Sequence, residues 1–431
     1  MFRKLNIIAQ VTETATERRG IYATLIAHSI TEEADALVAK LSAKVCERRT
    51  NRGREAAIHH AVGAFLADLL RAEAWKNAQG WVYRSLKTEA FSGEEVSYRA
   101  FKFVVESLVA LGWLQHVEGK RFWTANAFDP SARPFATGGH ASRFRMTPAL
   151  KALCEGVTSD HFIEPLPANP VVLRAAARGR GENKTRGKMM PVPQTEYTTR
   201  LIKQMKELNQ FLSEFEMRPY RFTGLVRNFN EGDKPSFDWN KGGRLYARGE
   251  LQYQFQSKED RAKITLDGEA TTEVDIRASF LATYHGLMKQ PFDPNYDPYE
   301  VEGIHRDAVK LWMLATFGSQ GHIRRWPNKL AEDYREKHGI APPKVSKIKE
   351  AMVAMFPVLA EWGNSGHTWA DLQFHESDAV FAAIFMLMKV HRIPAYPIHD
   401  SVIVRARDAE VAKEFIATSY KTSLQVDIAV R

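Results

Sequence analysis

The sequence predicts an α+β protein in which a helical N-terminal region precedes a C-terminal region with an antiparallel sheet. Two observations support this class. Helical hydrophobic spacing dominates residues 30–75, whereas the stretches TEVDI (272–276) and PIHDSVIV (397–404) have the composition of strands. At 431 residues the chain is long enough for two or three domains, each with its own core.

The charge balance favours a polyanionic partner. The chain carries a formal charge of +9, with a pI near 9.3, and such an excess suits nucleic acid, although basic proteins without such a partner also exist. Its two cysteines, Cys46 and Cys154, form no CxxC pair, which argues against a zinc ribbon or a disulfide framework. We expect a reduced, cytoplasmic protein, because no signal peptide and no run of about 20 apolar residues is present.

Residues 92–150 have the pattern of a winged helix-turn-helix. A helical face is followed by Gly112, which ends the helix, and WLQHVEGKRFWTA then predicts two short strands around a Glu118–Gly119 turn. The helical face consists of Phe101, Val104, Val105, Leu108 and Leu111. Such modules usually place a helix in the DNA major groove, although many bind only protein.

A further helix is expected just after this region. In RFRMTPALKAL a strand leads to Thr147 as N-cap and Pro148 at the first helical position. Together these patterns predict a helical and winged-helix DNA-binding region over residues 1–165.

Residues 166–197 are expected to be a basic linker, because glycines and charges dominate RAAARGRGENKTRGKMMPVP. This stretch is either a solvated tether or a basic arm over a phosphate backbone. Its cations are Arg174, Arg178, Arg180, Lys184, Arg186 and Lys188. A second domain is expected over 198–431, beginning with an amphipathic helix whose apolar face is formed by Leu201, Ile202, Met205, Leu208 and Leu212.

Three separated stretches of the second domain carry candidate chemistry. Asp275 ends a predicted strand just before a helix, and His399 and Asp400 lie between two apolar strands. Between them, Arg306, Lys310 and Phe317 share one helical face, an arrangement that suits a triphosphate above a base or sugar. Each feature also has a structural explanation, namely a helix N-cap, a polar hairpin turn and a solvated helix face.

The chemistry follows if Asp275 and Asp400 meet in space. Two carboxylates can hold two Mg²⁺ ions, or Mn²⁺ in their place, about 4 Å apart. One ion would activate a hydroxyl nucleophile and the other would neutralise leaving phosphates, while Arg306 and Lys310 steady the departing pyrophosphate.

In this order, the stretches resemble the palm and fingers of family A DNA polymerases and the related phage-type single-subunit RNA polymerases. EVDIRASFLA resembles motif A, RDAVKLWMLATFGS the fingers motif B, and PIHDSVIV motif C. The resemblance covers roughly residues 200–431. It implies a polymerase palm with an antiparallel sheet, a reduced helical fingers region, and metal binding by Asp275 and Asp400.

The resemblance also implies roles for further residues. GGRLYARGELQYQ matches the segment at the primer end or minor groove, which makes Arg244 a primer or template contact. LQFHESDAVFAAIFMLM matches the helix before motif C, so Gln373 or His375 is expected to face the template, and His399 belongs to the same primer–template set.

Three departures bear on the choice of sugar. Ser401 follows the motif C aspartate, as in the RNA polymerases, where DNA polymerases usually have Glu. Phe280 stands where family A DNA polymerases carry the Glu that screens the ribose 2′-hydroxyl, and its bulk can still exclude that group sterically. The spacing from Lys310 to Phe317 matches neither class.

The sequence therefore predicts a small, phage-like or plasmid-like DNA polymerase that extends a primer on a DNA template from nucleoside triphosphates. No paired-acid exonuclease pattern occurs in residues 1–200, so no proofreading is expected. A DNA-directed RNA polymerase is the first alternative. A DNA-binding replication or regulatory protein with an inactive palm is the alternative of another class.

Overall fold

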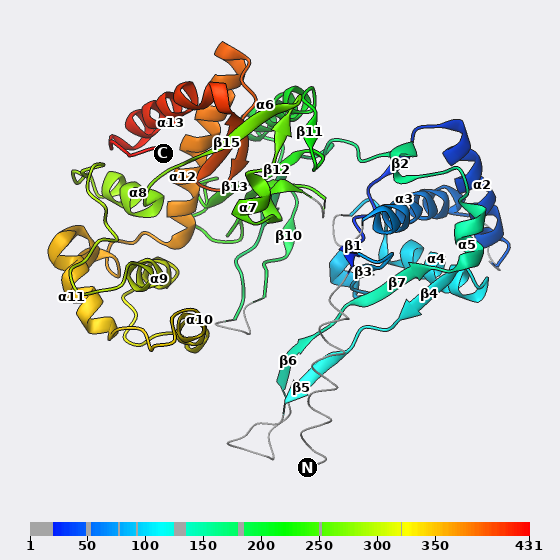
Figure 1. Cartoon of the computed structure of the whole chain (residues 1–431), viewed down its shortest axis with the longest axis horizontal. Coiled ribbons are helices and arrows are strands. Elements are labelled where there is room, and N and C mark those ends of the chain that lie inside the picture. Colours follow the sequence, from blue (N-terminus) through cyan, green and yellow to red (C-terminus); the bar gives the residue numbers. More distant parts are fainter. Residues whose placement is uncertain are drawn as a thin grey trace. The chain divides into compact units, whose positions relative to one another are not determined.

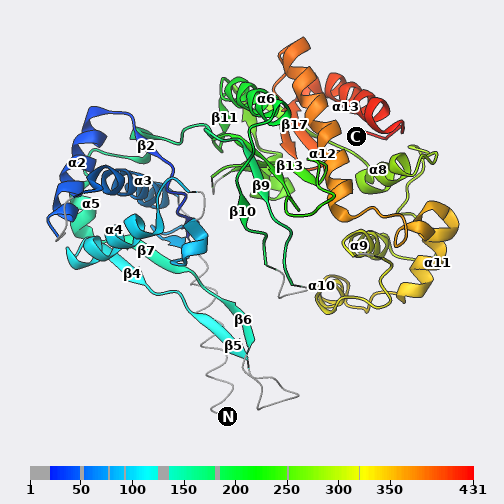
Figure 2. The ribbon, with the colours of Figure 1, turned by 180° about the vertical axis from the view of Figure 1, so that it is seen from behind.

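A computed structural model describes residues 20–48, 53–75, 78–91, 94–124, 135–179, 185–249, 252–319 and 321–431 (Figures 1 and 2). The fold is mixed α and β, as the sequence predicts. The main boundary between two compact units lies between Pro165 and Leu166. None of the described helices combines the length and the apolarity that a bilayer span requires.

The N-terminal unit combines helices with short strands. The sheet of four strands has the order β1-β3-β7-β4, and β2–β8 and β5–β6 form separate pairs. Its elements are β1 (Ile21–Tyr22), β2 (His28–Ser29), α2 (Glu32–Cys46), α3 (Glu55–Ala74), β3 (Val82–Arg84), α4 (Tyr98–Ala110), β4 (Leu114–Val117), β5 (Arg121–Thr124), β6 (Phe135–Gly139), β7 (Ser142–Met146), α5 (Pro148–Leu153) and β8 (Phe162–Ile163).

Helix α4 confirms the hydrophobic spacing seen in the sequence. The Ser97 side chain caps its N-terminus, and Gly112 follows its C-terminus with a φ of 71°, which glycine adopts without strain. Four of the five predicted face residues are buried and Leu111 is partly buried. Helix α5 begins as predicted, with Thr147 as N-cap and Pro148 at the first helical position.

The strands after α4 pair differently from the prediction. The expected turn at Glu118–Gly119 is absent, because β4 pairs with β7 and β5 pairs with β6. The chain instead runs straight through Gly119, whose backbone N–H donates to Ser142 Oγ at 3.1 Å. A Cβ on Gly119 would lie only 2.6 Å from the His140 carbonyl oxygen, so the missing side chain permits this close approach.

The C-terminal unit holds two larger sheets, with strand orders β10-β9-β12-β13 and β11-β14-β15-β17-β16. Its strands are β9 (Val171–Arg174), β10 (Met189–Met190), β11 (Met217–Arg218), β12 (Leu225–Phe229), β13 (Gly242–Ala247), β14 (Thr265–Leu266), β15 (Glu269–Asp275), β16 (Tyr396–Ile398) and β17 (Ser401–Arg405). Its helices are α6 (Glu196–Leu212), α7 (Lys258–Arg261), α8 (Ser279–Leu287), α9 (Arg306–Phe317), α10 (Asn328–His338), α11 (Val345–Met355), α12 (Trp369–Met386) and α13 (Ala409–Leu424).

The segment expected to be a basic linker contains regular structure. Strands β9 and β10 pair with one another, and β9 also pairs in parallel with β12. Beyond these strands, Arg178 and Thr185 form an antiparallel bridge, so residues 175–179 and 185–188 form the two sides of a β-hairpin arm. Arg180 and Lys184 lie outside the described residues. Apolar residues at Val171 and Leu173 are buried and dock the base of this arm, a feature that overall composition conceals.

Helices cover the sheet that carries β15 and β17. Helix α12 packs against α13, α8 and β13, and α13 packs against β15 and β17 (Figure 1). Four of the five predicted apolar residues of α6 are buried, and Ile202 is half-buried. Helices α9 and α11 share a separate apolar core with α8, which includes the buried indole of Trp312.

Phe101 lies in a cluster of aromatic rings within the N-terminal core. Its fully buried ring contacts those of Phe65, Phe91 and Phe144, with centroid separations of 5.0, 5.4 and 5.8 Å. We expect Phe101→Ala to lower the free energy of unfolding of this unit by about 3–5 kcal/mol, because it opens a cavity among aromatic rings. Hydrogen exchange in α3 and β7 peptides of the full chain measures this loss.

The matched control is Val109→Ala on the same helix. Its side chain is 40% exposed, so the expected change is below about 0.5 kcal/mol. Equal losses in both variants would contradict this packing scheme.

Candidate active site

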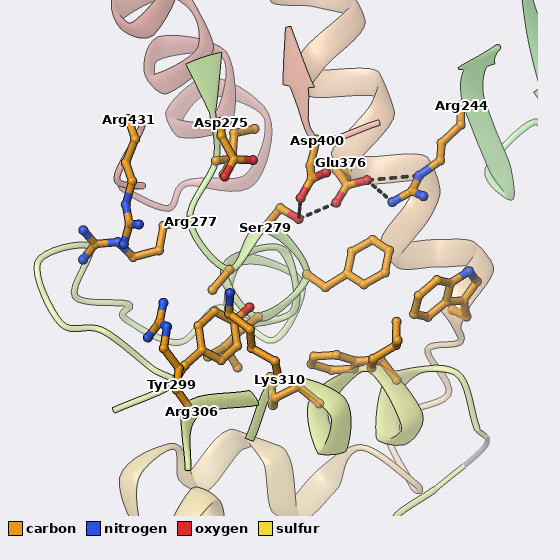
Figure 3. Close-up of a pocket in the computed structure, with 18 residues that line it drawn as sticks. Arg244, Asp275, Arg277, Ser279, Tyr299, Arg306, Lys310, Glu376, Asp400 and Arg431 are labelled. Atoms are coloured by element: carbon orange, nitrogen blue, oxygen red, sulfur yellow. Dashed lines mark hydrogen bonds and ion pairs between the residues drawn. The ribbon is translucent and has the colours of Figure 1, made fainter. Parts of the chain in front are cut away.

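Two paired strands bring Asp275 and Asp400 together at the same end of a sheet. Asp275 is the last residue of β15 and lies opposite Ser401, the first residue of β17. Asp400 directly precedes Ser401, and its carbonyl oxygen accepts a hydrogen bond from the Ile276 N–H at 3.3 Å. Both carboxylates line the same cleft (Figure 3). The strand end and the turn predicted from the sequence therefore meet in space.

The turn between β16 and β17 consists of His399 and Asp400. His399 has a φ of 57°, a conformation that few residues other than glycine adopt readily. Its ring packs edge-on against Tyr246 with a centroid separation of 5.7 Å. Burial lowers the pKa of His399, and Arg244 lowers it further against the opposing effect of Asp400. The lowered pKa favours the neutral form of the ring, which packs against Tyr246 beside the carboxylate.

The carboxylates of Asp275 and Asp400 lie close together without a cationic side chain paired to either of them within the described chain. Burial, together with the nearby carboxylates of Asp400 and Glu273, raises the pKa of Asp275 to about 6. Within the described part of the chain, neither Asp275 nor Asp400 belongs to an ion pair of 4 Å or less. A divalent cation bound between them would relieve their mutual repulsion, and Mg²⁺ prefers such sparse carboxylate ligation. The donor set therefore fits Mg²⁺.

A buried hydrogen-bond network contacts the carboxylate of Asp400. Ser279 Oγ lies 3.1 Å from Asp400 Oδ2 and 2.6 Å from Glu376 Oε2 (Figure 3). The other oxygen of Glu376 accepts two hydrogen bonds from the Arg244 guanidinium, the Nε bond being 3.2 Å long. Burial and the nearby Asp400 raise the pKa of Glu376 to about 7, against the lowering effect of Arg244 and of the Ser279 hydrogen bond.

The sequence singled out Arg244 as a primer or template contact, and the structure places it in this network. Its side chain is mostly buried, and its guanidinium also lies 5.2 Å from the centre of the Phe280 ring. Glu376 raises the pKa of Arg244, outweighing the lowering effect of burial. Arg244 therefore remains charged and serves as the counter-ion of a fully buried carboxylate.

The opposite wall of the cleft is helix α9. Arg306, Lys310 and Phe317 all line the cleft, so their predicted shared face is confirmed. Arg306 donates to Asp297 Oδ2 at 2.6 Å, and both cations lie over the Tyr299 ring, at 5.0 Å and 5.3 Å. Burial, together with the nearby Asp400 carboxylate, raises the pKa of Tyr299 to about 12.

Aromatic rings also line the cleft, which has a volume of about 450 Å³. Phe317 is buried against Trp362, with a centroid separation of 4.9 Å, and contributes only an edge to the cleft. Phe280 is half-buried and packs edge-on against Trp369 at 4.5 Å. This volume lies within the usual range for a small-molecule site, and the lining combines acids, cations and aromatic surface.

Gln373 and His375 do not line this cleft. Gln373 lines a neighbouring groove of about 540 Å³ that also includes Arg186 and Asn230. His375 is half-buried, and burial lowers its pKa. Helix α12 reaches the acidic cleft through Glu376, which lies one residue beyond His375 and therefore about 100° further round the helix.

Several residues of the cleft carry no signal in the sequence. Arg277 and Arg431 lie together on the side of Asp275 (Figure 3). Arg431 arrives through long-range pairing, because its N–H donates to the Asp275 carbonyl oxygen at 2.9 Å and Val430 bridges Ile276. For Ser279 and Glu376 the available clues were weak, namely a serine at the start of α8 and one of three acids within a mostly apolar helix.

Comparison with known families found no family model that matches this chain, and a search of curated proteins found no match either.

Removal of Arg244 should reveal its role as a counter-ion. Arg244→Met leaves Glu376 buried without a cation, so we expect the unfolding free energy to fall by about 3–5 kcal/mol at pH 8. The pKa of Glu376 in the folded protein already exceeds its ordinary value of 4.5, and loss of Arg244 raises it further. Below about pH 7 Glu376 is protonated in both folded proteins, so the destabilisation relative to the unaltered protein should grow only as pH rises above about 7. Hydrogen exchange in α12 peptides measures it.

Two companion variants sharpen this measurement. Arg244→Met combined with Glu376→Gln should recover most of the loss, because no buried charge remains. Lys421→Met removes an exposed ion pair with Asp427 and should cost less than about 1 kcal/mol. A loss that is independent of pH and persists in the double variant would refute the counter-ion role.

Proposed function

We propose that this protein is a templated nucleotidyltransferase that extends the 3′-hydroxyl of a primer on DNA, as a DNA polymerase without proofreading. One observation carries the proposal. Asp275 and Asp400 lie at the ends of adjacent strands, and the cationic helix α9 faces them across a cleft of about 450 Å³. This arrangement supports the motif resemblance, because it brings the three motifs together around one cavity.

The acidic wall would hold the metal ions. Two Mg²⁺ ions bound by Asp275 and Asp400 would supply activation of the primer hydroxyl and neutralisation of the leaving phosphates. Ser279 keeps the Asp400 carboxylate oriented through its 3.1 Å contact, and Glu376 in turn orients Ser279. The acids are thus positioned before any substrate arrives, which favours catalysis by preorganisation.

The cationic wall would bind the triphosphate. Lys310 is exposed and, within the described chain, has no carboxylate partner within ion-pair distance, so its ammonium group is available to a phosphate. Arg306 is shared with Asp297 and would contribute less. Arg277 and Arg431 add positive charge on the side of Asp275. Phe280 and Phe317 would contact the sugar and the base.

The choice of sugar rests on Phe280 in this proposal. Ser401 Oγ donates to Glu273 Oε1 at 2.9 Å and is buried, so the residue after Asp400 supports the sheet. Its likeness to RNA polymerases therefore carries little weight for substrate choice. The half-buried ring of Phe280 lies in the cleft, where its bulk would exclude a 2′-hydroxyl.

The N-terminal unit and the basic arm are proposed to hold DNA. Helix α4 followed by the β4–β7 ladder supports the winged-helix interpretation, in which the helix enters the major groove. In the C-terminal unit, Arg186 of the arm and Gln373 line one groove, which suits a phosphate backbone beside a polar amide.

The direct test is primer extension with dNTPs or NTPs, each with Mg²⁺. We expect dNTP incorporation by the unaltered protein and none by Asp400→Asn, because the amide is a poor ligand for Mg²⁺. DNA affinity should be nearly unchanged in this variant. Asp427→Asn, an exposed residue outside the cleft, serves as the matched control and should retain activity.

Three other outcomes have clear meanings. Incorporation of NTPs alone identifies an RNA polymerase. DNA binding without incorporation of either substrate identifies a binding protein with an inactive palm. Full activity in Asp400→Asn would refute the proposed active site.

Lys310 should act mainly on the nucleotide. Lys310→Ala removes one charged contact to phosphate, worth about 1.5–3 kcal/mol, so we expect kcat/KM for dNTP to fall by about 10- to 100-fold. Steady-state extension at varied dNTP concentration measures the effect. Lys329→Ala, an exposed lysine on α10, should leave this ratio unchanged. An equal fall in both variants would point to a general loss of positive charge.

A further inference from the structure

We propose that His28, His60 and Glu95 in the N-terminal unit form a binding site for a divalent transition-metal ion of the zinc class. One ligand atom from each residue lies within 4.8 Å of the other two. The Nε2 atoms of both histidines face the same carboxylate oxygen, Glu95 Oε2, at 3.6 Å and 3.7 Å. The site is independent of the proposed polymerase activity.

The spacing of these atoms fits a shared ion better than direct pairing. Ligands bonded tetrahedrally to zinc at about 2.0–2.1 Å are themselves about 3.3–3.5 Å apart. A histidinium–carboxylate pair gains most when it closes to about 2.7–2.9 Å. Neither histidine makes such a bond to Glu95. The two imidazole rings lie side by side, with a separation of 4.8 Å between the ring centroids of His28 and His60.

The ligands come from three separate segments. His28 begins β2, His60 lies in the first half of α3, and Glu95 precedes the Ser97 cap of α4 by two residues. Strand β2 packs against α3 (Figure 2). A bound ion would therefore connect β2, α3 and the start of α4, and would fix the position from which α4 begins.

The donor set also suggests the class of ion. Two imidazoles and one carboxylate suit zinc and its neighbours in the transition series better than Mg²⁺ or Ca²⁺, which prefer oxygen ligands alone. All three side chains are partly exposed, which leaves a path for the ion and a fourth position for water or an outside ligand. The site thus has the open form of a three-ligand zinc centre.

A second cluster in the described chain serves as a comparison. His305, Asp307 and His338 also lie close together, at the N-terminus of α9 and the C-terminus of α10. There Lys337 Nζ already donates to Asp307 Oδ2 at 2.7 Å, and His305 Nδ1 accepts from the Asp307 N–H. A metal would have to displace these contacts, so this cluster is the weaker candidate.

The experiment uses the full chain after treatment with a chelator. Titration with Co²⁺ should give the strong visible absorption of a tetrahedral ion at one equivalent, and Zn²⁺ should displace it. His60→Ala and Glu95→Gln should each weaken Zn²⁺ binding by at least about 100-fold, because loss of a ligand should cost no less than loss of an outer-shell partner. Zn²⁺ should also slow hydrogen exchange at residues 94–100 in the unaltered protein only.

Two variants serve as controls. His59→Ala removes an exposed neighbour of His60, and His338→Ala disrupts the comparison cluster; both should retain the Co²⁺ spectrum. Absence of binding by the unaltered protein would overturn the proposal. So would binding that survives both His60→Ala and Glu95→Gln, or binding lost only in His338→Ala. Glu95→Gln changes a partly exposed side chain and should fold normally, so the test does not depend on His60→Ala alone.

Discussion

The antiparallel pairing of β15 with β17 is the constraint on which the acidic cleft depends. Because Asp275 lies opposite Ser401, the residue before Ser401 must emerge beside the end of β15. The backbone hydrogen bonds between β15 and β17 therefore fix the positions of the two aspartates relative to one another, more firmly than two loops would. The β16–β17 turn, with His399 in the left-handed region, completes this geometry at the cost of local backbone strain.

The cleft contains acids that have hydrogen-bond and ion-pair partners beside acids that have no ion-pair partner within the described chain. Glu376 is fully buried but has Arg244 and Ser279 as hydrogen-bond partners, whereas Asp275 is left with a raised pKa and no ion-pair partner within the described chain. Charge that is paired stabilises the fold, and charge that is left unpaired is available to a ligand. The cations of α9 line the same cleft, and within the described chain they form no ion pair with Asp275 or Asp400.

Local patterns predicted much of this site, and long-range contacts account for the rest. The strand ending at Asp275, the turn at Asp400 and the shared face of Arg306 and Lys310 follow from periods of 2.0 and 3.6 residues, which a sequence displays directly. Arg431 reaches the cleft only through pairing with β15, which no local pattern reveals. On α12 the sequence pointed to Gln373 and His375 as template contacts and gave no reason to place Glu376 beside the acids, since rotation about a helix axis depends on tertiary packing.

The same distinction applies to strand pairing. Composition identified β4 and β5 as strands, yet the turn expected between them is absent, because Gly119 allows the chain to pass close to residues 140–142. Likewise, a few buried residues such as Val171 and Leu173 fix the base of the arm, although charge dominates its overall composition.

Helix α8 has a mechanical consequence for the cleft. It contains nine residues and begins four positions after Asp275. Ser279 at its start touches Asp400, while Leu281 and Tyr284 belong to the apolar core shared with α9. A shift of α8 would therefore act on both walls of the cavity, because the same helix contacts Asp400 and the core beneath α9. The distance between the acids and the cations is thus coupled to the position of one helix.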